Sequence, residues 1–273
     1  MQVRPGIELS NLTDVGCQRE NNEDYYCYWE PESEQEFFQK GRLAIIADGM
    51  GGNEAGEVAS RLAVETVRDI YVNSPDGDPQ SALLAGFRAA HETIRQAARE
   101  NPQLQGMGTT CTAVAVTGDR LHFVHVGDSR LYLFRNGLIS ALTKDQSYVD
   151  RLVESGIITQ EQARDHPQRH ILTSALGVSG ELSVEVSAEP FALEPADVLL
   201  LCTDGLYSML TDEELLQVLN AQAPALVCPE LVRIAKERGG PDNITVQILR
   251  VTAKVDVSTS NEVLVRDAKG RQP

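Results

Sequence analysis

The sequence predicts an α+β fold in which antiparallel strands are covered by helices. Three apolar, strand-like runs, 109–117, 121–126 and 130–135, are joined by connections too short for the crossover that parallel strands require. Asn136-Gly137 separates the last run from a further apolar segment, and this pair is the strongest short-range signal for a hairpin. We therefore expect antiparallel pairing, which excludes a doubly wound parallel sheet.

The N-terminal part alternates strands with polar loops. Apolar residues at every second or third position predict a strand over 7–15, and a polar loop at 18–24 separates it from a strand at 25–29. The acidic segment 30–40 is turn-like, and the sequence does not fix its detail. A short apolar run then ends in Asp48 and a glycine-rich stretch, which predicts a buried strand with a carboxylate at its end.

Two amphipathic helices follow this strand. Apolar residues of 54–71 recur at i, i+3, i+4 and i+7, and the proline- and glycine-containing segment 75–79 ends the pattern. A second helix is predicted over 81–100 and ends at Asn101-Pro102. Two such helices can cover one face of a sheet.

Residues 145–175 form a mostly polar excursion that we interpret as a flap. A helix is predicted over 148–154, where Gly156 stops it, and Thr159 with Gln162 fits a capping box that starts another helix. A long polar excursion between core strands is often a lid over a site.

The C-terminal part returns to core elements. The predicted elements are strands at 184–189, 197–203 and 244–251, a short helix capped by Thr211, and a helix over 229–237. From residue 253 to 273 the chain is charged and rich in small residues, so we expect a loosely held tail after one domain that spans 1–252.

Composition limits the function. The chain of 273 residues carries 24 basic and 40 acidic residues, a formal charge of −16 that disfavours nucleic acid and anionic membranes as partners. The longest apolar run, 198–202, is far shorter than the roughly 20 residues of a membrane helix, and the N-terminus lacks the apolar core of a signal peptide. The five cysteines are scattered and show no zinc-binding spacing. This usage is typical of a protein in the reducing cytoplasm.

Acidic residues stand at the ends of several predicted strands. Asp48, Asp128 and Asp204 follow apolar runs, whereas Glu23, Asp24 and Asp242 precede them. Singly, each residue fits a turn cap; gathered at one rim, carboxylates about 4 Å apart would repel by several kcal/mol unless cations lay between them. Because all these ligands are oxygens, Mg²⁺ or Mn²⁺ is expected rather than zinc.

A series of motifs over about residues 7–251 resembles that of the metal-dependent type 2C (PPM-type) serine/threonine protein phosphatases, in order. The motifs are Thr13-Asp-Val-Gly16, Arg19-x-x-Asn22-Glu23-Asp24, Asp48-Gly-Met-Gly-Gly52, Gly108-Thr-Thr110, Val126-Gly-Asp-Ser-Arg130, Cys202-Thr-Asp-Gly205 and Gly239-Gly-Pro-Asp-Asn243. Each motif is weak alone, but the ordered set is specific. The compact bacterial members are the most similar in character.

The resemblance implies a four-layer α-β-β-α sandwich with two central antiparallel sheets and a two-metal centre at one edge. The implied ligands of Mn²⁺ or Mg²⁺ are Asp48, the Gly49 carbonyl, Asp204 and Asp242, with Asp128 and Asp204 available to a third, weaker ion. Glu23, Asp24 and Asn243 would belong to the shell of metal-bound waters. Arg19 would bind the substrate phosphate, so that Arg19 and Asp48 are the implied catalytic residues.

The implied activity is hydrolysis of phosphoserine and phosphothreonine by direct attack of a metal-bridging water. No phosphoenzyme is needed, which agrees with the absence of a Cys-x-x-x-x-x-Arg loop. The resemblance implies phosphorylated proteins as substrates and a Ser/Thr kinase that acts on the same targets in bacterial signalling. We expect a cytoplasmic monomer whose flap selects the protein substrate.

The chain departs from the family pattern at several positions. Met50 stands where eukaryotic relatives commonly have a histidine that protonates the leaving group, and Asn53 stands where many bacterial members have histidine. The flap begins Asp145-Gln146-Ser147 in place of a histidine-containing version. The leaving-group acid is therefore open, with His166 and His170 in the flap as candidates or simply as solvated loop residues.

Two other functions compete with the phosphatase. A nucleotide-binding loop fits poorly, because no GxxxxGK[ST] occurs and Glu54 stands where GxGxxG needs its third glycine. A catalytically inactive phosphatase-like domain that acts as a regulatory binding module is the alternative, although every expected carboxylate and Arg19 are retained.

Overall fold

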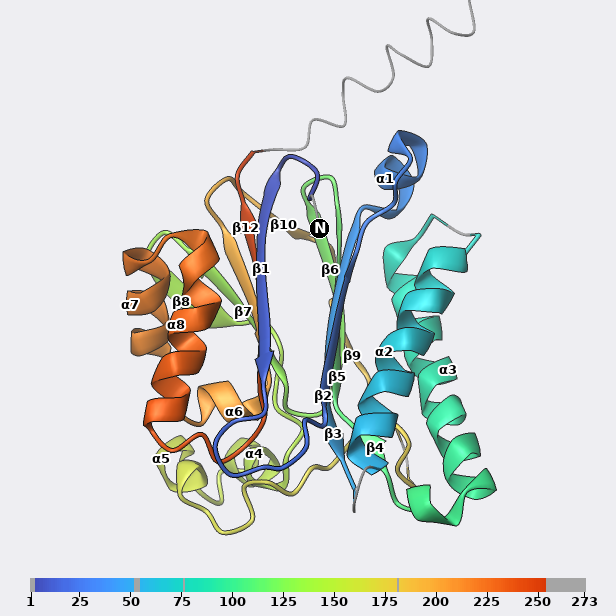
Figure 1. The fold of residues 1–273 in the computed structure, drawn as a ribbon, viewed down its shortest axis with the longest axis vertical. Coiled ribbons are helices and arrows are strands. Elements are labelled where there is room, and N and C mark those ends of the chain that lie inside the picture. Colours follow the sequence, from blue (N-terminus) through green and yellow to red (C-terminus); the bar gives the residue numbers. More distant parts are fainter. Residues whose placement is uncertain (1–2, 52–54, 76, 181, 254–273) are drawn as a thin grey trace, which may run out of the picture.

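The computed structural model describes residues 3–51, 55–75, 77–180 and 182–253. In this part of the chain two antiparallel sheets lie face to face, and helices cover the outer face of each (Figure 1). The predicted α+β class and the four-layer sandwich are thereby confirmed. The predicted tail, 253–273, lies outside the described residues except for Ala253.

The first sheet has five strands within the described residues. Their order is β1 (Ile7–Asp14), β12 (Ile244–Val251), β11 (Val198–Cys202), β7 (Arg130–Arg135) and β8 (Leu138–Ala141). Strands β7 and β8 form the predicted hairpin, and both turn residues, Asn136 and Gly137, have positive φ (53° and 76°), as this type of turn requires.

The second sheet has seven strands within the described residues. Its path is β10 (Phe191–Ala192), β6 (Arg120–Val126), β5 (Cys111–Thr117), β3 (Arg42–Met50) and β2 (Asp24–Trp29), with β4 (Gly108–Thr109) on β3 and β9 (Glu185–Val186) on β6.

One expected pairing is wrong. Strands β6 and β7 are only three residues apart, yet they belong to different sheets, so they do not pair. Gly127 turns the chain from one sheet to the other with φ of 105°, and an added Cβ there would lie 2.6 Å from the Thr110 side chain.

Five of the eight α-helices in the described residues lie against the outer faces of the sheets. Helices α2 (Ala55–Asn73) and α3 (Pro79–Glu100) pack on the second sheet, while α6 (Asp204–Tyr207), α7 (Asp212–Ala221) and α8 (Pro224–Glu237) lie beside the first (Figure 1). The capping box at Thr211 is present. Helix α8 begins five residues earlier than predicted, because Pro224 and not Pro229 occupies its first turn.

The remaining elements are short. The segment that the sequence left open contains α1 (Glu34–Lys40), capped by Ser33, and η1 (Pro102–Leu104) follows α3. The flap carries α4 (Tyr148–Glu154) and α5 (Gln160–Arg164) with the predicted capping box at Thr159. In the predicted strand at 184–189, only β9 is a strand, and both β10 and α6 were not predicted.

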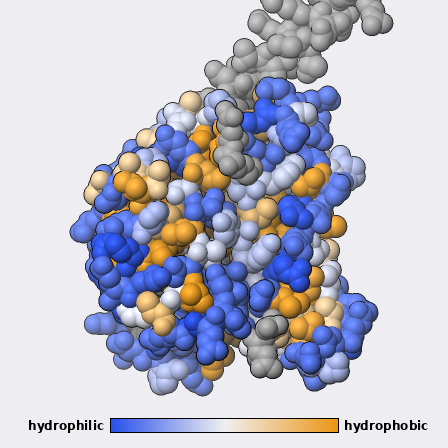
Figure 2. All heavy atoms as spheres, in the orientation of Figure 1, coloured by the Kyte–Doolittle hydropathy of each residue, from blue (hydrophilic) through white to orange (hydrophobic). Residues whose placement is uncertain are grey.

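Three apolar clusters separate the layers. One lies between the second sheet and α2 and α3, one between the two sheets, and one between the first sheet and α7 and α8. Figure 2 shows a mainly hydrophilic face with scattered apolar residues. No helix in the described ranges is both long and apolar enough to cross a bilayer.

Candidate metal centre

The predicted acidic residues meet at one edge of the sandwich. Asp48 on β3 stands opposite Asp24 on β2 in the antiparallel register. Burial, and after it the negative charges of Asp24, Asp204, Asp128 and Asp242, raise the pKa of Asp48, so these four carboxylates interact electrostatically with it. Residues that are far apart in the sequence therefore share one site, at the end of the molecule where α4, α5 and α6 lie (Figure 1).

The backbone of Asp48 is fixed by two threonines. Its N–H donates to Thr110 Oγ1 at 2.9 Å, and its carbonyl accepts from Thr110 N at 2.9 Å and from Thr109 Oγ1 at 2.8 Å. Thr110 Oγ1 is also 2.7 Å from the hydroxyl of Ser129, the neighbour of Asp128. The strand that presents Asp48 is thus tied to the turn that presents Asp128.

Gly49 leaves room for the loop that carries Glu23. Its N–H donates to the Glu23 carbonyl at 3.0 Å, and an added Cβ would lie 2.0 Å from Gly56 O and 2.6 Å from Glu23 O. Any side chain at position 49 would displace backbone, so the close approach of these segments requires glycine.

Asp24 joins the two sheets. Its Oδ2 accepts hydrogen bonds from Thr203 Oγ1, directly after β11, at 2.9 Å and from Thr245 Oγ1, on β12 of the other sheet, at 2.6 Å. Thr13 Oγ1 lies 2.8 Å from Thr245 Oγ1 and extends this hydroxyl network. Thr203 and Thr245 were not among the predicted site residues.

Asn243 clamps the loops around Asp242. Its side-chain Oδ1 accepts from Glu23 N at 2.8 Å, and its Nδ2 donates to Val15 O at 3.0 Å and to Asn21 O at 2.9 Å. The amide therefore contacts three backbone groups, and the structure gives Asn243 a role in shaping the rim. Its predicted contact with metal-bound water stays a prediction.

Arg19 lies at the rim of the site. Its Nη2 is 2.8 Å from Asp242 Oδ2, and its Nη1 is 3.9 Å from Glu23 Oε2. The side chain keeps 47% of its surface exposed, so the guanidinium is accessible to a ligand from solvent.

Burial and mutual repulsion disfavour the charged carboxylates. Burial, followed by the charges of neighbouring aspartates, raises the pKa of Asp48 and of Asp128 well above the usual value. Burial raises the pKa of Asp24 to about 7, although the hydroxyls of Thr245 and Thr203 act in the opposite direction. Burial also raises the pKa of Glu23, which Arg19 partly offsets. Positive charge at this edge would stabilise the ionised cluster.

The chemistry of the donors fits a hard divalent cation. Three buried carboxylate oxygens, Glu23 Oε1, Asp24 Oδ1 and Asp204 Oδ1, have no hydrogen-bond partner within the described residues, and all are the donor type that Mg²⁺ and Mn²⁺ prefer. In the described ranges, however, no three acidic, histidine or cysteine side chains are close enough together to form a ready-made ion site. The predicted ligand set therefore stays a prediction.

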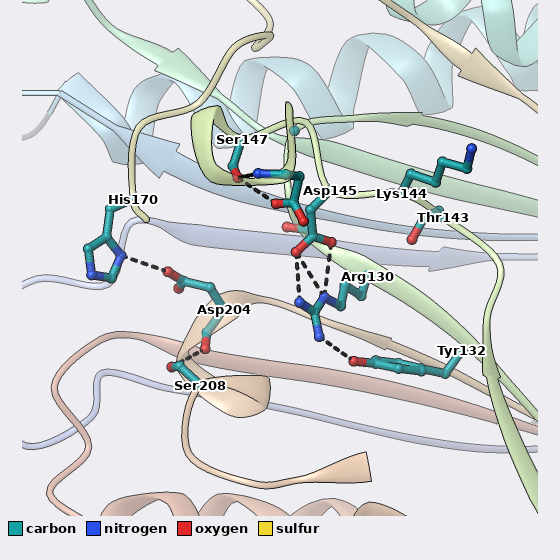
Figure 3. Close-up of polar contacts among 12 residues, drawn as sticks. Arg130, Tyr132, Thr143, Lys144, Asp145, Ser147, His170, Asp204 and Ser208 are labelled. Atoms are coloured by element: carbon teal, nitrogen blue, oxygen red, sulfur yellow. Dashed lines mark hydrogen bonds and ion pairs between the residues drawn. The ribbon is translucent and has the colours of Figure 1, made fainter. Parts of the chain in front are cut away.

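The flap brings a histidine to this edge. His170 Nδ1 lies 3.9 Å from Asp204 Oδ2, and the imidazole is 61% exposed (Figure 3). His166 instead accepts from Gln168 N at 3.1 Å and its ring packs near Tyr148. The side chain of Met50 reaches toward Gly108, where an added Cβ would lie 3.0 Å from Met50 Cε. Gly52, Asn53 and Glu54 lie outside the described residues.

Comparison with known proteins points to one family. A family model, protein phosphatase 2C, matches residues 20–232. The serine/threonine protein phosphatase PstP of Mycobacterium tuberculosis is 39% identical over 245 residues, which are 90% of this chain and 45% of that protein. The chain thus spans less than half the length of this relative. Protein phosphatase PhpP of Streptococcus pneumoniae is 35% identical over 248 residues, 89% of this chain and 97% of that protein.

The fold is also shared with solved structures. The catalytic domain of PstP, described as a complex with two manganese ions, superposes with a TM-score of 0.77 at 36% identity. The match covers 91% of this chain and 99% of that chain.

Proposed function

The chain belongs to the protein phosphatase 2C family, and from this membership we propose that it hydrolyses phosphoserine and phosphothreonine in proteins with the help of divalent metal ions. The observation that carries the proposal is that strand register and hydrogen bonds bring the backbone at Asp48, Asp24, Asp128, Asp204 and Asp242 to one edge of the sandwich. The relatives named above, which are phosphatases, support it.

Different residues at this edge would bind the metal ions, orient water and bind the substrate phosphate. Asp48, the Gly49 carbonyl, Asp204 and Asp242 would hold two ions, and Asp128 with Asp204 a third. When bound, Mg²⁺ or Mn²⁺ supplies an activated water and offsets negative charge on the phosphoryl group. Glu23 and Asp24 present buried oxygens without partners in the described structure, which suits them to orient water. Arg19 offers an exposed fork of N–H donors for two phosphate oxygens.

One arm of the Arg19 fork, Nη2, is already paired in the structure. Its partner is Asp242, so an ion on Asp242 would compete for the same carboxylate and release the guanidinium for substrate. Binding of metal and binding of phosphate are therefore coupled through Asp242 in this proposal.

The setting of the reaction is also a proposal. We propose one catalytic domain over residues 1–252 that acts as a monomer in the cytoplasm. The five cysteines, all in the described part of the chain, are free thiols, which supports a reducing compartment. Because the substrates are phosphoproteins, a Ser/Thr kinase must supply them, and the charge of −16 disfavours nucleic acid as a partner.

Hydrolysis of an aryl phosphate tests the proposal. We expect activity with Mn²⁺ that EDTA abolishes, and a loss of about a hundredfold or more in Asp48→Asn, because several kcal/mol of charge stabilisation is removed. Asp119→Asn is the matched control, since Asp119 lies in the turn between β5 and β6, 40% exposed and paired with Arg120.

The alternative, an inactive binding module, makes the opposite prediction. If the purified chain bound Mn²⁺ and a phosphopeptide but released no phosphate from either substrate, the enzyme proposal would be wrong. Equal activity in Asp48→Asn and Asp119→Asn would contradict the assigned centre.

A further inference from the structure

Arg130 is the most fully partnered cation near the base of the flap. It is the first residue of β7, and its Nε donates to both oxygens of Asp145 at 2.9 and 3.1 Å, while Nη2 donates to Asp145 Oδ2 at 2.7 Å. Its Nη1 donates to Tyr132 Oη at 2.7 Å. Every nitrogen of the guanidinium thus has a protein partner, and Figure 3 shows the fork that holds Asp145.

The same guanidinium contacts the metal-binding edge. Its Cζ lies 3.7 Å from the ring centroid of Tyr207, and Tyr207 is the last residue of α6, the short helix that Asp204 begins. In the sheet, Arg130 stands opposite Cys202, two residues before Asp204. Arg130 therefore lies between Asp145 of the flap and the helix that carries Asp204.

Asp145 begins the base of the flap, where residues 145–148 are hydrogen-bonded to residues 171–173; we call this the closed base. Its neighbour Gln146 exchanges two hydrogen bonds with Gly127, at 2.7 Å from Gln146 N to Gly127 O and at 3.0 Å from Gly127 N to Gln146 Oε1. The returning end of the flap joins the same segment, because Thr173 N donates to Gln146 O at 2.7 Å and Tyr148 N donates to Ile171 O at 2.7 Å. Both ends of the flap are therefore tied to one turn.

We infer that the Arg130–Asp145 ion pair is the anchor that sets the position of the flap over the metal-binding edge, and that it thereby determines how well the enzyme binds phosphoproteins. Arg130 and Asp145 act as positioning residues, since in the described structure their charged groups bond to each other and to Tyr132 and reach Asp128 only through their electrostatic fields. His170, which the flap places 3.9 Å from Asp204, is one residue from the closed base, so a shift of the base moves it. The kinetic part of this inference rests on the proposed phosphatase function.

The molecule contains a matched control for this pair. Arg135 ends the same strand β7 and forms an equivalent fork with Asp197, with Nε to Oδ1 at 2.8 Å and Nη2 to Oδ2 at 2.5 Å. Both arginine side chains are 25% exposed, and each carboxylate is largely buried. The Arg135–Asp197 pair lies at the other end of β7, away from the flap. It is therefore the same type of ion pair, but it does not contact the flap.

The test compares Asp145→Asn with Asp197→Asn by hydrogen exchange and by kinetics with Mn²⁺. We expect Asp145→Asn, and not Asp197→Asn, to increase amide exchange over 146–173. Loss of the charge-assisted bonds should raise KM for a phosphoserine peptide roughly fivefold, while kcat for an aryl phosphate changes less than about twofold. Arg130→Lys, which keeps the charge but cannot form the fork, should show the same pattern less strongly.

The possible results separate the two proposals. Equal flap exchange in Asp145→Asn and Asp197→Asn, or an equal loss of turnover on both substrates, would overturn the anchor. If Asp145→Asn does not fold, Arg130→Lys decides between the same outcomes. If the wild-type chain hydrolyses neither substrate, the proposed function fails, and the exchange comparison alone still supports or overturns the anchor.

Discussion

The hydroxyl of Thr245 on β12 donates a 2.6 Å hydrogen bond to Oδ2 of Asp24 on β2, and thus joins two sheets through residues 221 positions apart. Thr203 donates to the same oxygen at 2.9 Å. One carboxylate oxygen is thereby fixed inside the protein, while Oδ1 is left without a partner in the described structure. The two threonines orient Asp24 toward the metal-binding edge, as partners behind a metal site commonly do.

Replacement of Thr245 by valine tests this orientation. Thr245→Val keeps the shape but leaves Asp24 with one hydroxyl donor, so we expect about 1–3 kcal/mol lower stability in urea denaturation. Calorimetric titration should show about tenfold weaker Mn²⁺ binding, the lower end of such effects. Thr245→Ser keeps the hydroxyl and is the control; equal Mn²⁺ affinity in the serine and valine variants would contradict this role.

Local signals predicted most of the fold. Two helix starts were predicted from their caps, at Thr159 and Thr211, and the β7–β8 hairpin was predicted from Asn136-Gly137. These predictions were correct because each signal lies within the element that it specifies. Helix α1 carries a local cap at Ser33, but its seven residues are too few to show a helical apolar period, and its Phe37 ring contacts the distant Arg4 and Arg42. The start of α8 was misplaced because either Pro224 or Pro229 could occupy a first turn.

The acidic residues of the site could be predicted from the sequence, but the contacts among them could not. Aspartates at strand ends are visible in the sequence, and adjacent strands bring such ends together. Their partners are not visible, since Arg19 pairs with Asp242 across 223 positions and no local pattern specifies that contact. For the same reason the sequence revealed the flap but not the ion pair that anchors it.

His125 should make stability depend on pH. With its proton on Nε2 the buried neutral imidazole donates to the carbonyls of Gly127 and Lys144, and its Nδ1 lies 2.8 Å from Thr112 Oγ1, whose hydroxyl also lies 3.0 Å from Ser129 O. Burial lowers its pKa to about 4, although the two carbonyls act in the opposite direction. Below the ordinary pKa of about 6.5 the unfolded chain binds the proton first, so stability is fully present above that pH and falls toward pH 4.

Denaturation of His125→Gln at several pH values isolates this effect. The wild-type chain should lose roughly 2–4 kcal/mol more than the variant between pH 7 and pH 4, because only the wild type carries this titrating group. The buried aspartates with raised pKa values act with the opposite sign, but they are common to both proteins and cancel in the difference. Parallel pH curves for the two proteins would show that His125 is not the cause.

The flap should govern substrate choice more than chemistry. Tyr148 and Ile171 are joined at its base, so residues 149–168 can be replaced by a short glycine-serine linker without separating the ends. We expect such a variant to keep aryl phosphate turnover within about threefold and to lose tenfold or more on a phosphoprotein, which has a larger surface to contact. An equal loss on both substrates would mean that the flap serves the chemical step instead.

His170 is the better placed of the two flap histidines to serve as leaving-group acid. It lies beside Asp204 and is 61% exposed, whereas His166 is turned toward Tyr148 and the Gln168 backbone. A serine alkoxide needs a proton as it leaves, and a nitrophenolate does not, so loss of the acid should slow only the former.

Two variants measured on two substrates therefore test the assignment. His170→Gln should reduce kcat on a phosphoserine peptide about a hundredfold and change p-nitrophenyl phosphate turnover little. His166→Gln, the matched control in the same flap, should leave the ratio of the two rates unchanged. If His170→Gln slowed both substrates equally, His170 would act by positioning the flap. If it slowed neither, solvent water would be the proton donor, which is the remaining source at an edge where Met50 stands in place of the histidine common in eukaryotic relatives.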